Sequence, residues 1–134
     1  MQMKWSQRAH RRNDDGFTLV EIMVVVVIIG LLAGLVGPKL FKNLEKANRE
    51  TAKTQMSNLK TSLATYRLDL GRYPDQLNCL VSPCGDGWNG PYLDSDEVPL
   101  DPWKNEYMYE VRDNGKSFTL TSSAGGDEPI SVTG

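Results

Sequence analysis

Few side chains in this 134-residue sequence are suited to catalysis. The single histidine, His10, precedes a long apolar run, so the chain beyond residue 16 contains no histidine. A serine or cysteine nucleophile usually needs a histidine base, which the larger part of the chain lacks. Paired carboxylates such as Asp94 and Asp96 can do acid–base chemistry, but nothing in the sequence places them in a cleft. We therefore predict that the protein is not an enzyme.

Two cysteines, Cys79 and Cys84, lie close together beyond the apolar run. Their spacing and position fit an oxidising compartment, so we expect a disulfide, with two free thiols as the alternative. The bridge would close a small loop and contribute about 2 kcal/mol. Two cysteines without a histidine are too few ligands for a zinc site.

Four acidic side chains in the second half of the chain also raise the question of a metal site. They are Asp94, Asp96, Glu97 and Asp101. Glycine and proline are frequent around them, which is typical of turns, and acidic side chains often cap turns or remain in solvent. We favour turn caps and solvated charge over a metal site for these four residues.

A long apolar run near the N-terminus organises the rest of the chain. Residues 22–36 contain no charged or amide side chain, and the segment from Phe17 to Val36 has about 20 residues. As a helix it spans roughly 30 Å, the thickness of a bilayer core. Glu21 lies near its start, where a charge costs on the order of 2.5–3.5 kcal/mol on insertion scales. An acid in a membrane helix indicates a function, and its partner has to be identified.

The segment before the run is short and basic. It carries Lys4, Arg8, Arg11 and Arg12, and positive charge beside the first apolar segment keeps that side in the cytoplasm. The rest of the chain is then expected outside the cytoplasm. An ordinary signal peptide fits poorly, because the run is long and lacks a good small-residue cleavage site. A plain uncleaved anchor leaves the acid in the run unexplained.

The junction at residues 16–21, Gly-Phe-Thr-Leu-Val-Glu, resembles the prepilin peptidase site of type IV pilins and type II secretion pseudopilins. The match joins a basic leader, a Gly–Phe junction, an acid shortly after it and an uninterrupted apolar helix. The resemblance implies cleavage between Gly16 and Phe17 on the cytoplasmic side, followed by N-methylation of the Phe17 amine. The apolar run is then retained, as a membrane anchor before assembly and as the filament core afterwards.

Cleavage would supply a partner for Glu21, because it creates a cationic amine at Phe17. In a staggered filament we predict that Glu21 of one subunit pairs with the Phe17 amine of a neighbour. Truncating one partner of a buried ion pair is strongly destabilising, so the pair would enforce axial register. The alternative is that Glu21 extends alone toward the lipid headgroups.

Residues that weaken a helix follow in the second half of the run: Gly30, Gly34, Gly37 and Pro38. Each glycine costs about 1 kcal/mol relative to alanine, and the proline removes a backbone donor. We expect this segment to stretch or melt when subunits pack. Residues 39–70 then form an amphipathic helix, which Gly71 is placed to end. Its apolar stripe recurs every three or four residues, at Ala52, Met56, Leu59, Leu63, Tyr66 and Leu70.

The remaining residues predict a small globular head. Residues 107–112 alternate in polarity, residues 113–115 (Asp-Asn-Gly) are a strong turn signal, and residues 118–121 form the returning strand. This hairpin and one more short strand would make an antiparallel sheet that covers the helix stripe. We expect the polar tail from Ser122 to Gly134 to be a loop or a frayed edge. The fold class is α+β, with a long N-terminal helix packed on a small C-terminal antiparallel sheet.

Three motifs in the head extend the resemblance over nearly the whole chain from residue 16 to about 124. They are residues 71–74 (Gly-Arg-Tyr-Pro), residues 88–93 (Trp-Asn-Gly-Pro-Tyr-Leu) and residues 98–103 (Val-Pro-Leu-Asp-Pro-Trp) with Asn105 and Tyr107. Together they look like the major pseudopilins of the type II secretion system, the G-type subunits. The resemblance implies a type IV pilin-like fold.

The sequence departs from that family in two places. Cys79 and Cys84 lie in a segment where the family pattern has no cysteine, and the loop near the C-terminus is shorter. In the family this loop is acidic and binds calcium through carboxylates and backbone carbonyls. Here Asp127 and Glu128 are its acids and the candidate calcium ligands. Calcium takes six to eight oxygens, so two carboxylates alone rarely suffice. We expect no other cofactor.

The resemblance implies a structural subunit that polymerises into a periplasmic pseudopilus and drives folded proteins through an outer-membrane channel. The implied partners are further copies of the chain in a helical homopolymer, minor pseudopilins, the prepilin peptidase and the inner-membrane assembly platform. The implied location is the inner membrane, with a single pass, a cytoplasmic N-terminus before cleavage and a periplasmic head. The alternative is a type IV pilin of a surface or DNA-uptake fibre.

The sequence thus divides into four predicted parts. Residues 1–16 are a cleaved basic leader, residues 17–38 the transmembrane and filament-core helix, residues 39–70 the amphipathic helix, and residues 71–134 the periplasmic head. Residues 17–134 carry 11 basic and 15 acidic side chains, a net charge of −4. An acidic mature chain argues against nucleic acid as a partner, because binding the phosphate backbone requires a basic face.

Overall fold

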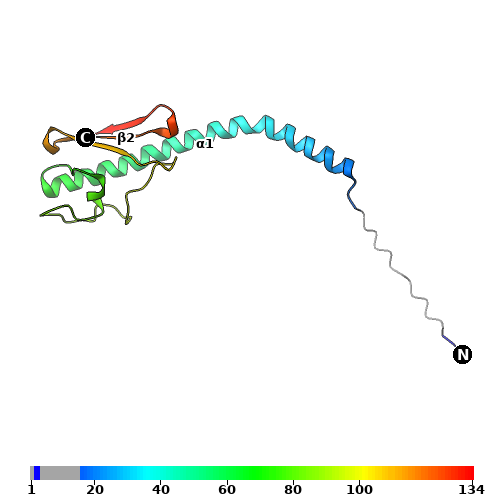
Figure 1. Cartoon of the computed structure of the whole chain (residues 1–134), viewed down its shortest axis with the longest axis horizontal. Coiled ribbons are helices and arrows are strands. Elements are labelled where there is room, and N and C mark those ends of the chain that lie inside the picture. Colours follow the sequence, from blue (N-terminus) through cyan, green and yellow to red (C-terminus); the bar gives the residue numbers. More distant parts are fainter. Residues whose placement is uncertain (1, 4–15) are drawn as a thin grey trace. The chain divides into compact units, whose positions relative to one another are not determined.

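The computed structural model describes residues 2–3 and 16–134, so the basic residues of the predicted leader lie outside the described residues. The chain forms two compact units, residues 1–40 and 41–134, and each is described by itself. Figure 1 shows one long helix and a small sheet. The elements are α1 (Leu19–Leu70), β1 (Met108–Arg112), β2 (Ser117–Ser122) and β3 (Ile130–Thr133), with short 3₁₀ turns at η1 (Leu77–Leu80), η2 (Asp113–Gly115) and η3 (Ala124–Gly126).

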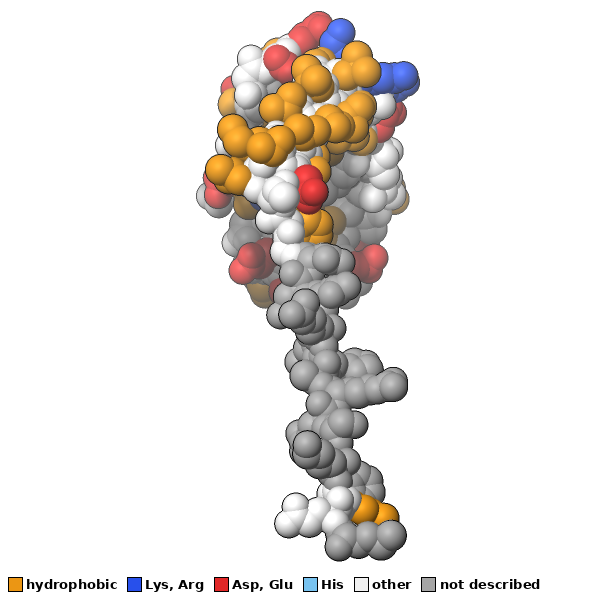
Figure 2. Space-filling view, turned by 90° about the vertical axis from the view of Figure 1, so that its right-hand side faces the viewer, with side chains coloured by type: hydrophobic (Ala, Val, Ile, Leu, Met, Phe, Trp, Pro, Cys, Tyr) orange, Lys and Arg blue, Asp and Glu red, His pale blue; other side chains and the backbone are white. Residues whose placement is uncertain are grey.

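The first unit contains the apolar half of α1. Every residue from Leu19 to Val36 is exposed in the single chain. Figure 2 shows hydrophobic side chains gathered on one face of the molecule, with few charged side chains among them. Among the described residues, α1 is the one helix long and apolar enough to cross a membrane. The helix continues through Pro38 in the single chain. We predicted that residues 30–38 stretch or melt when subunits pack together, and this stays a prediction.

The second half of α1 provides the core of the head. Its predicted apolar stripe is confirmed, because Ala52, Met56, Leu59, Leu63 and Tyr66 are all buried and Leu70 packs at the margin of the core. The predicted end of the helix is also confirmed. Gly71 adopts a φ of +78°, which favours glycine, and its N–H donates to the carbonyl of Arg67 at 2.8 Å.

The sheet is antiparallel, in the order β1-β2-β3. The predicted hairpin is confirmed: Arg112 pairs with Ser117, and the Asp-Asn-Gly turn lies between β1 and β2. Gly115 has a φ of +83°, and a Cβ there would come within 2.9 Å of the Cβ of Arg72. Alternate residues of β2, Phe118 and Leu120 among them, are buried against the core.

The prediction that residues 122–134 form a loop or a frayed edge is wrong. This tail contains β3, which pairs with β2 from Ser122 opposite Ile130 to Thr119 opposite Thr133. Gly134 extends the pairing, because its N–H and carbonyl both bond to Phe118. The Ile-Ser-Val-Thr segment alternates and contains β-branched residues, a strand signal that the polar and glycine-rich residues before it obscured.

Two tyrosine hydroxyl groups connect the region of β1 to the rest of the head. Tyr107 lies just before β1, and Tyr109 lies in it. The Tyr107 hydroxyl donates to Gln55 Oε1 on α1, and the Tyr109 hydroxyl donates to the Pro74 carbonyl at 2.7 Å. Burial and the Asp101 carboxylate raise the pKa of Tyr107 to about 12. Burial also raises the pKa of Tyr109 well above its usual value. Both hydroxyls are therefore held protonated by the fold.

These two pKa shifts predict a loss of stability at alkaline pH. An unfolded tyrosine titrates near pH 10, so the folded state binds more protons than the unfolded state above that pH. The stability that the tyrosines contribute is complete below about pH 10 and falls as the pH rises toward 12. We expect the denaturation midpoint of the head to fall across that range. Tyr107→Phe should make the fall shallower; an unchanged pH dependence in this variant would contradict the assignment.

Candidate processing and assembly site at the N-terminus

The site is built on the first turn of α1. Gly16, Phe17 and Thr18 precede the helix, which begins at Leu19. Thr18 Oγ1 accepts a hydrogen bond from the backbone N–H of Glu21 at 3.2 Å. This cap satisfies one of the amides that the first turn leaves without a partner. Thr18 was not among the residues predicted from the sequence, although Thr-x-x-Glu before an apolar run is a recognised capping signal.

Glu21 lies in an apolar setting with a local positive field. Phe17, Val20 and Val24 line the same shallow hollow of about 510 Å³ as Glu21. The positive end of the helix dipole favours a carboxylate in the first turn. Glu21 is itself exposed in the single chain. Lipid or neighbouring helices around it would lower the effective dielectric constant and strengthen its attraction to a cation. The structure thus places the two predicted assembly residues, Phe17 and Glu21, around one hollow.

The Gly16–Phe17 bond lies in non-helical backbone. Phe17 is 83% exposed, so the side chain at the predicted cleavage point is accessible in the chain alone. A Cβ at Gly16 would meet no other atom within 4 Å in the described part of the chain. The same holds for Gly30, Gly34 and Gly37, so the single chain gives no steric reason for these glycines. Their predicted helix-weakening role stays a prediction.

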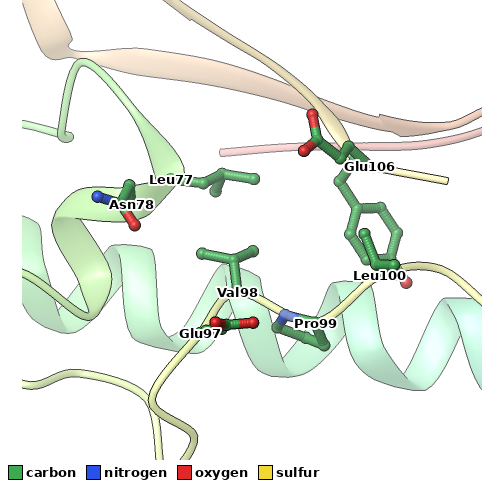
Figure 3. Close-up of a pocket in the computed structure, with 8 residues that line it drawn as sticks. Leu77, Asn78, Glu97, Val98, Pro99, Leu100 and Glu106 are labelled. Carbon is green, nitrogen blue, oxygen red and sulfur yellow. The ribbon is translucent and has the colours of Figure 1, made fainter. Parts of the chain in front are cut away.

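The head has a groove of a size that could hold a small ligand. It holds about 390 Å³ and is lined by residues of η1, the 97–100 segment and the residues just before β1 (Figure 3). Glu97 and Glu106 contribute carboxylates, and the rest of the lining is Leu77, Asn78, Val98, Pro99, Leu100 and Tyr107. This lining contains no serine, cysteine, histidine or lysine.

Asp101 is confirmed as a turn cap. It is 1% exposed, and its Oδ1 accepts the backbone N–H groups of Trp103 at 3.1 Å and Asn105 at 2.8 Å. Its Oδ2 accepts the hydroxyl of Ser122 at 2.8 Å. The other three acids of the sequence analysis, Asp94, Asp96 and Glu97, are exposed. Among the described residues, no group of three or more His, Cys, Asp or Glu side chains could hold a metal ion.

The candidate calcium ligands, Asp127 and Glu128, lie exposed between η3 and β3. The carbonyl oxygen of Glu128 accepts a hydrogen bond from Arg49 Nη1 at 2.9 Å, so a cationic side chain already occupies this loop. The buried carboxylate of Asp101, which is bonded to Ser122 just before this loop, has both oxygens engaged. Asp127 and Glu128 are thus the two candidate carboxylates of a site for which calcium takes six to eight oxygens.

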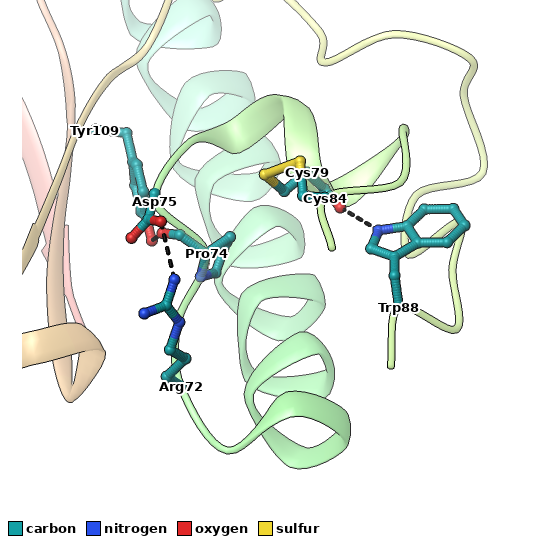
Figure 4. Close-up of a disulfide and its surroundings, with 7 residues drawn as sticks. All are labelled: Arg72, Pro74, Asp75, Cys79, Cys84, Trp88 and Tyr109. Carbon is teal, nitrogen blue, oxygen red and sulfur yellow. Dashed lines mark hydrogen bonds and ion pairs between the residues drawn. A yellow bond between two sulfur atoms is a disulfide. The ribbon is translucent and has the colours of Figure 1, made fainter. Parts of the chain in front are cut away.

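The predicted disulfide between Cys79 and Cys84 is present (Figure 4). The two Cα atoms are 5.3 Å apart, and Cys79 is buried. Trp88 Nε1 donates to the Cys79 carbonyl at 2.7 Å, and the backbone N–H of Tyr92 donates to Leu80 at 2.7 Å. The bridge therefore anchors a segment of the head that has no strands.

Comparisons with known proteins agree with this geometry. Residues 39–132 match the family described as type II secretion system (T2SS), protein G, and residues 11–37 match the prokaryotic N-terminal methylation motif. The second match includes Gly16, Phe17 and Glu21. The two matches therefore cover the predicted processing junction, the helix and the head.

Named relatives agree with the family match. The chain is 40% identical to a type II secretion system core protein G of Vibrio cholerae, over 92% of this chain and 89% of the relative. It is also 40% identical to the core protein G of Pseudomonas aeruginosa, over 84% of each. The crystal structure of the major pseudopilin of enterohaemorrhagic Escherichia coli shares the fold, with a TM-score of 0.55, 24% identity and coverage of 70% of this chain and 93% of that one.

These matches favour the secretion pseudopilin over the alternative of a surface or DNA-uptake pilin. The type IV pilin-like fold class predicted from the sequence is confirmed by the long helix, the three-stranded sheet and the structural match. The chain belongs to the protein G family of the type II secretion system.

Proposed function

We propose that the chain is the major structural subunit of a type II secretion pseudopilus and has no catalytic role. The observation that carries this proposal is the exposed apolar half of α1, joined to a compact head. Apolar surface of this extent must be covered by lipid or by protein. A bilayer covers it before assembly, and the helices of neighbouring copies cover it in the filament. The filament then pushes folded proteins through an outer-membrane channel.

Processing by a prepilin peptidase converts the precursor into this subunit. The proposal is supported by the methylation motif over residues 11–37 and by the non-helical, exposed backbone at Gly16 and Phe17. A peptidase requires an accessible, extended segment, which a bond inside α1 would not provide. The basic leader keeps the N-terminus in the cytoplasm, and the head lies in the periplasm. Minor pseudopilins and an inner-membrane assembly platform are the further partners of this function.

Glu21 sets the register of the filament in this proposal. Its carboxylate lies in the apolar hollow that Phe17 also lines, and the amine that cleavage creates at Phe17 is the nearest new cation. Within one chain the helix holds the two residues about one turn apart. A neighbour displaced along the axis can bring its own Phe17 amine to the carboxylate. An unpaired charge in apolar surroundings is costly, so only the correct stagger is stable.

The first prediction from this proposal concerns cleavage. Intact-mass measurement of membrane-extracted protein should give a chain that begins at Phe17 and carries one added methyl group. Gly16→Asp should block cleavage, because a charged side chain replaces the hydrogen beside the bond, whereas Gly16→Ala should retain partial cleavage. A mature N-terminus at Met1, or one beyond Ala33, would contradict the proposal.

The second prediction concerns assembly. Glu21→Val should insert and be cleaved normally, since removing an acid eases residence in the bilayer, but filaments should be lost. Thr18→Ala is the matched control, because it weakens the helix cap and keeps the carboxylate. Thr18→Ala should keep its filaments; if only helix capping matters, Thr18→Ala should lose them and Glu21→Val, which keeps the capping N–H, should not. Normal sheared filaments from correctly processed Glu21→Val protein would refute the pairing.

The third prediction tests the function itself. A strain that lacks this protein should retain its exported proteins in the periplasm, and the wild-type gene should restore their release. Surface piliation should not depend on the gene. Loss of piliation with normal secretion would instead support a pilin.

A further inference from the structure

We infer that the loop between β2 and β3 (residues 123–129, the closing loop) is held by the chain's own side chains and folds without calcium. This inference differs from what the family resemblance implies for the equivalent loop. It rests on three sets of contacts that meet at the closing loop, each involving residues distant from it in the sequence. It concerns the folding of the head, so it does not depend on the proposed function.

The first set is the buried cluster of Asp101, Ser122 and Ala124. Ser122 is 0% exposed; its hydroxyl donates to Asp101 Oδ2 at 2.8 Å and accepts the backbone N–H of Ala124 at 3.2 Å. The closing loop is thereby connected at its start to the 101–105 turn. Hydrogen bonds to a buried carboxylate are among the stronger ones in proteins. Oδ2 of Asp101 thus accepts a hydroxyl and Oδ1 accepts two backbone N–H groups, so both oxygens have partners within the chain.

The second set places Trp103 against the middle of the closing loop. A Cβ at Gly125 would come within 2.5 Å of Trp103 Cδ1, so the indole ring packs directly on the backbone of Gly125. Trp103 Nε1 lies 3.4 Å from Glu45 Oε2 on α1. The other oxygen of Glu45 is the one buried side-chain atom without a hydrogen bond among the described residues. The indole ring therefore holds the middle of the closing loop against α1 through contacts made within the chain.

The third set places a permanent cation at the end of the closing loop. Arg49 Nη1 donates to the Glu128 carbonyl at 2.9 Å, across 79 residues of sequence. A guanidinium remains charged at all accessible pH values, so it supplies a positive charge that needs no bound ion. It would also repel a divalent cation placed on the same carbonyl. Arg49 thus contributes from α1 the electrostatic function that calcium would have here.

The experiment uses the purified full chain in detergent. Thermal unfolding is followed by circular dichroism in excess calcium chloride and in excess EGTA. A ligand that binds the native state raises the midpoint by mass action, so we expect equal midpoints in the two solutions. The double variant Asp127→Asn, Glu128→Gln should also melt at the same temperature in both. A midpoint that rises with calcium in the parent and falls back in this double variant would overturn the inference.

Two further variants test the side-chain contacts directly. Ser122→Ala should lower the midpoint by about 5–15 °C, because it leaves one oxygen of the buried Asp101 without a partner. Arg49→Ala removes a contact at the surface, so it should lower the midpoint by less than Ser122→Ala does. Ser131→Ala is the matched control, since its hydroxyl bonds only to Thr121 at the exposed edge. A Ser122→Ala protein that melts like the parent, or that calcium restores, would overturn the inference.

Discussion

The apolar half of α1 is the constraint on which the rest of the molecule depends. From Leu19 to Val36 its side chains are exposed in the single chain, and water cannot solvate them favourably. The helix therefore requires lipid or other helices around it at every stage. In the function proposed above, lipid covers this surface before assembly and neighbouring helices cover it in the filament.

The head is small, and its stability comes from a few well-connected contacts. One stripe of α1 packs under a sheet of three strands, and the segment between helix and sheet contains only a short 3₁₀ turn. A small domain buries a smaller fraction of its surface than a large one does. The buried Asp101 and the tyrosine hydroxyls add contacts between irregular backbone and the helix or sheet. The disulfide between Cys79 and Cys84 closes a loop within the irregular segment itself.

Glu21 has two electrostatic relationships, and they belong to different states of the protein. In the single chain its backbone N–H bonds to Thr18 and its carboxylate benefits from the helix dipole. In the function proposed above, breaking the Gly16–Phe17 bond creates a partner of full positive charge, the Phe17 amine. The proposal thus links processing of the chain to its assembly.

Local patterns in the sequence determined the elements whose residues are near one another in the chain. The apolar spacing of Ala52 to Tyr66, the Gly71 terminus and the Asp-Asn-Gly hairpin all followed from periodicity and turn chemistry. The Gly16–Glu21 junction pointed to the family by its resemblance to a known motif. The strand from Ile130 to Thr133 had a local signal, but its pairing with β2 was decided by the tertiary structure. Tertiary structure alone decided that Asp101 is buried against Ser122 and that Arg49 reaches Glu128. These contacts join residues far apart in sequence, and their partners are chosen by the packing of the whole head, which no local pattern encodes.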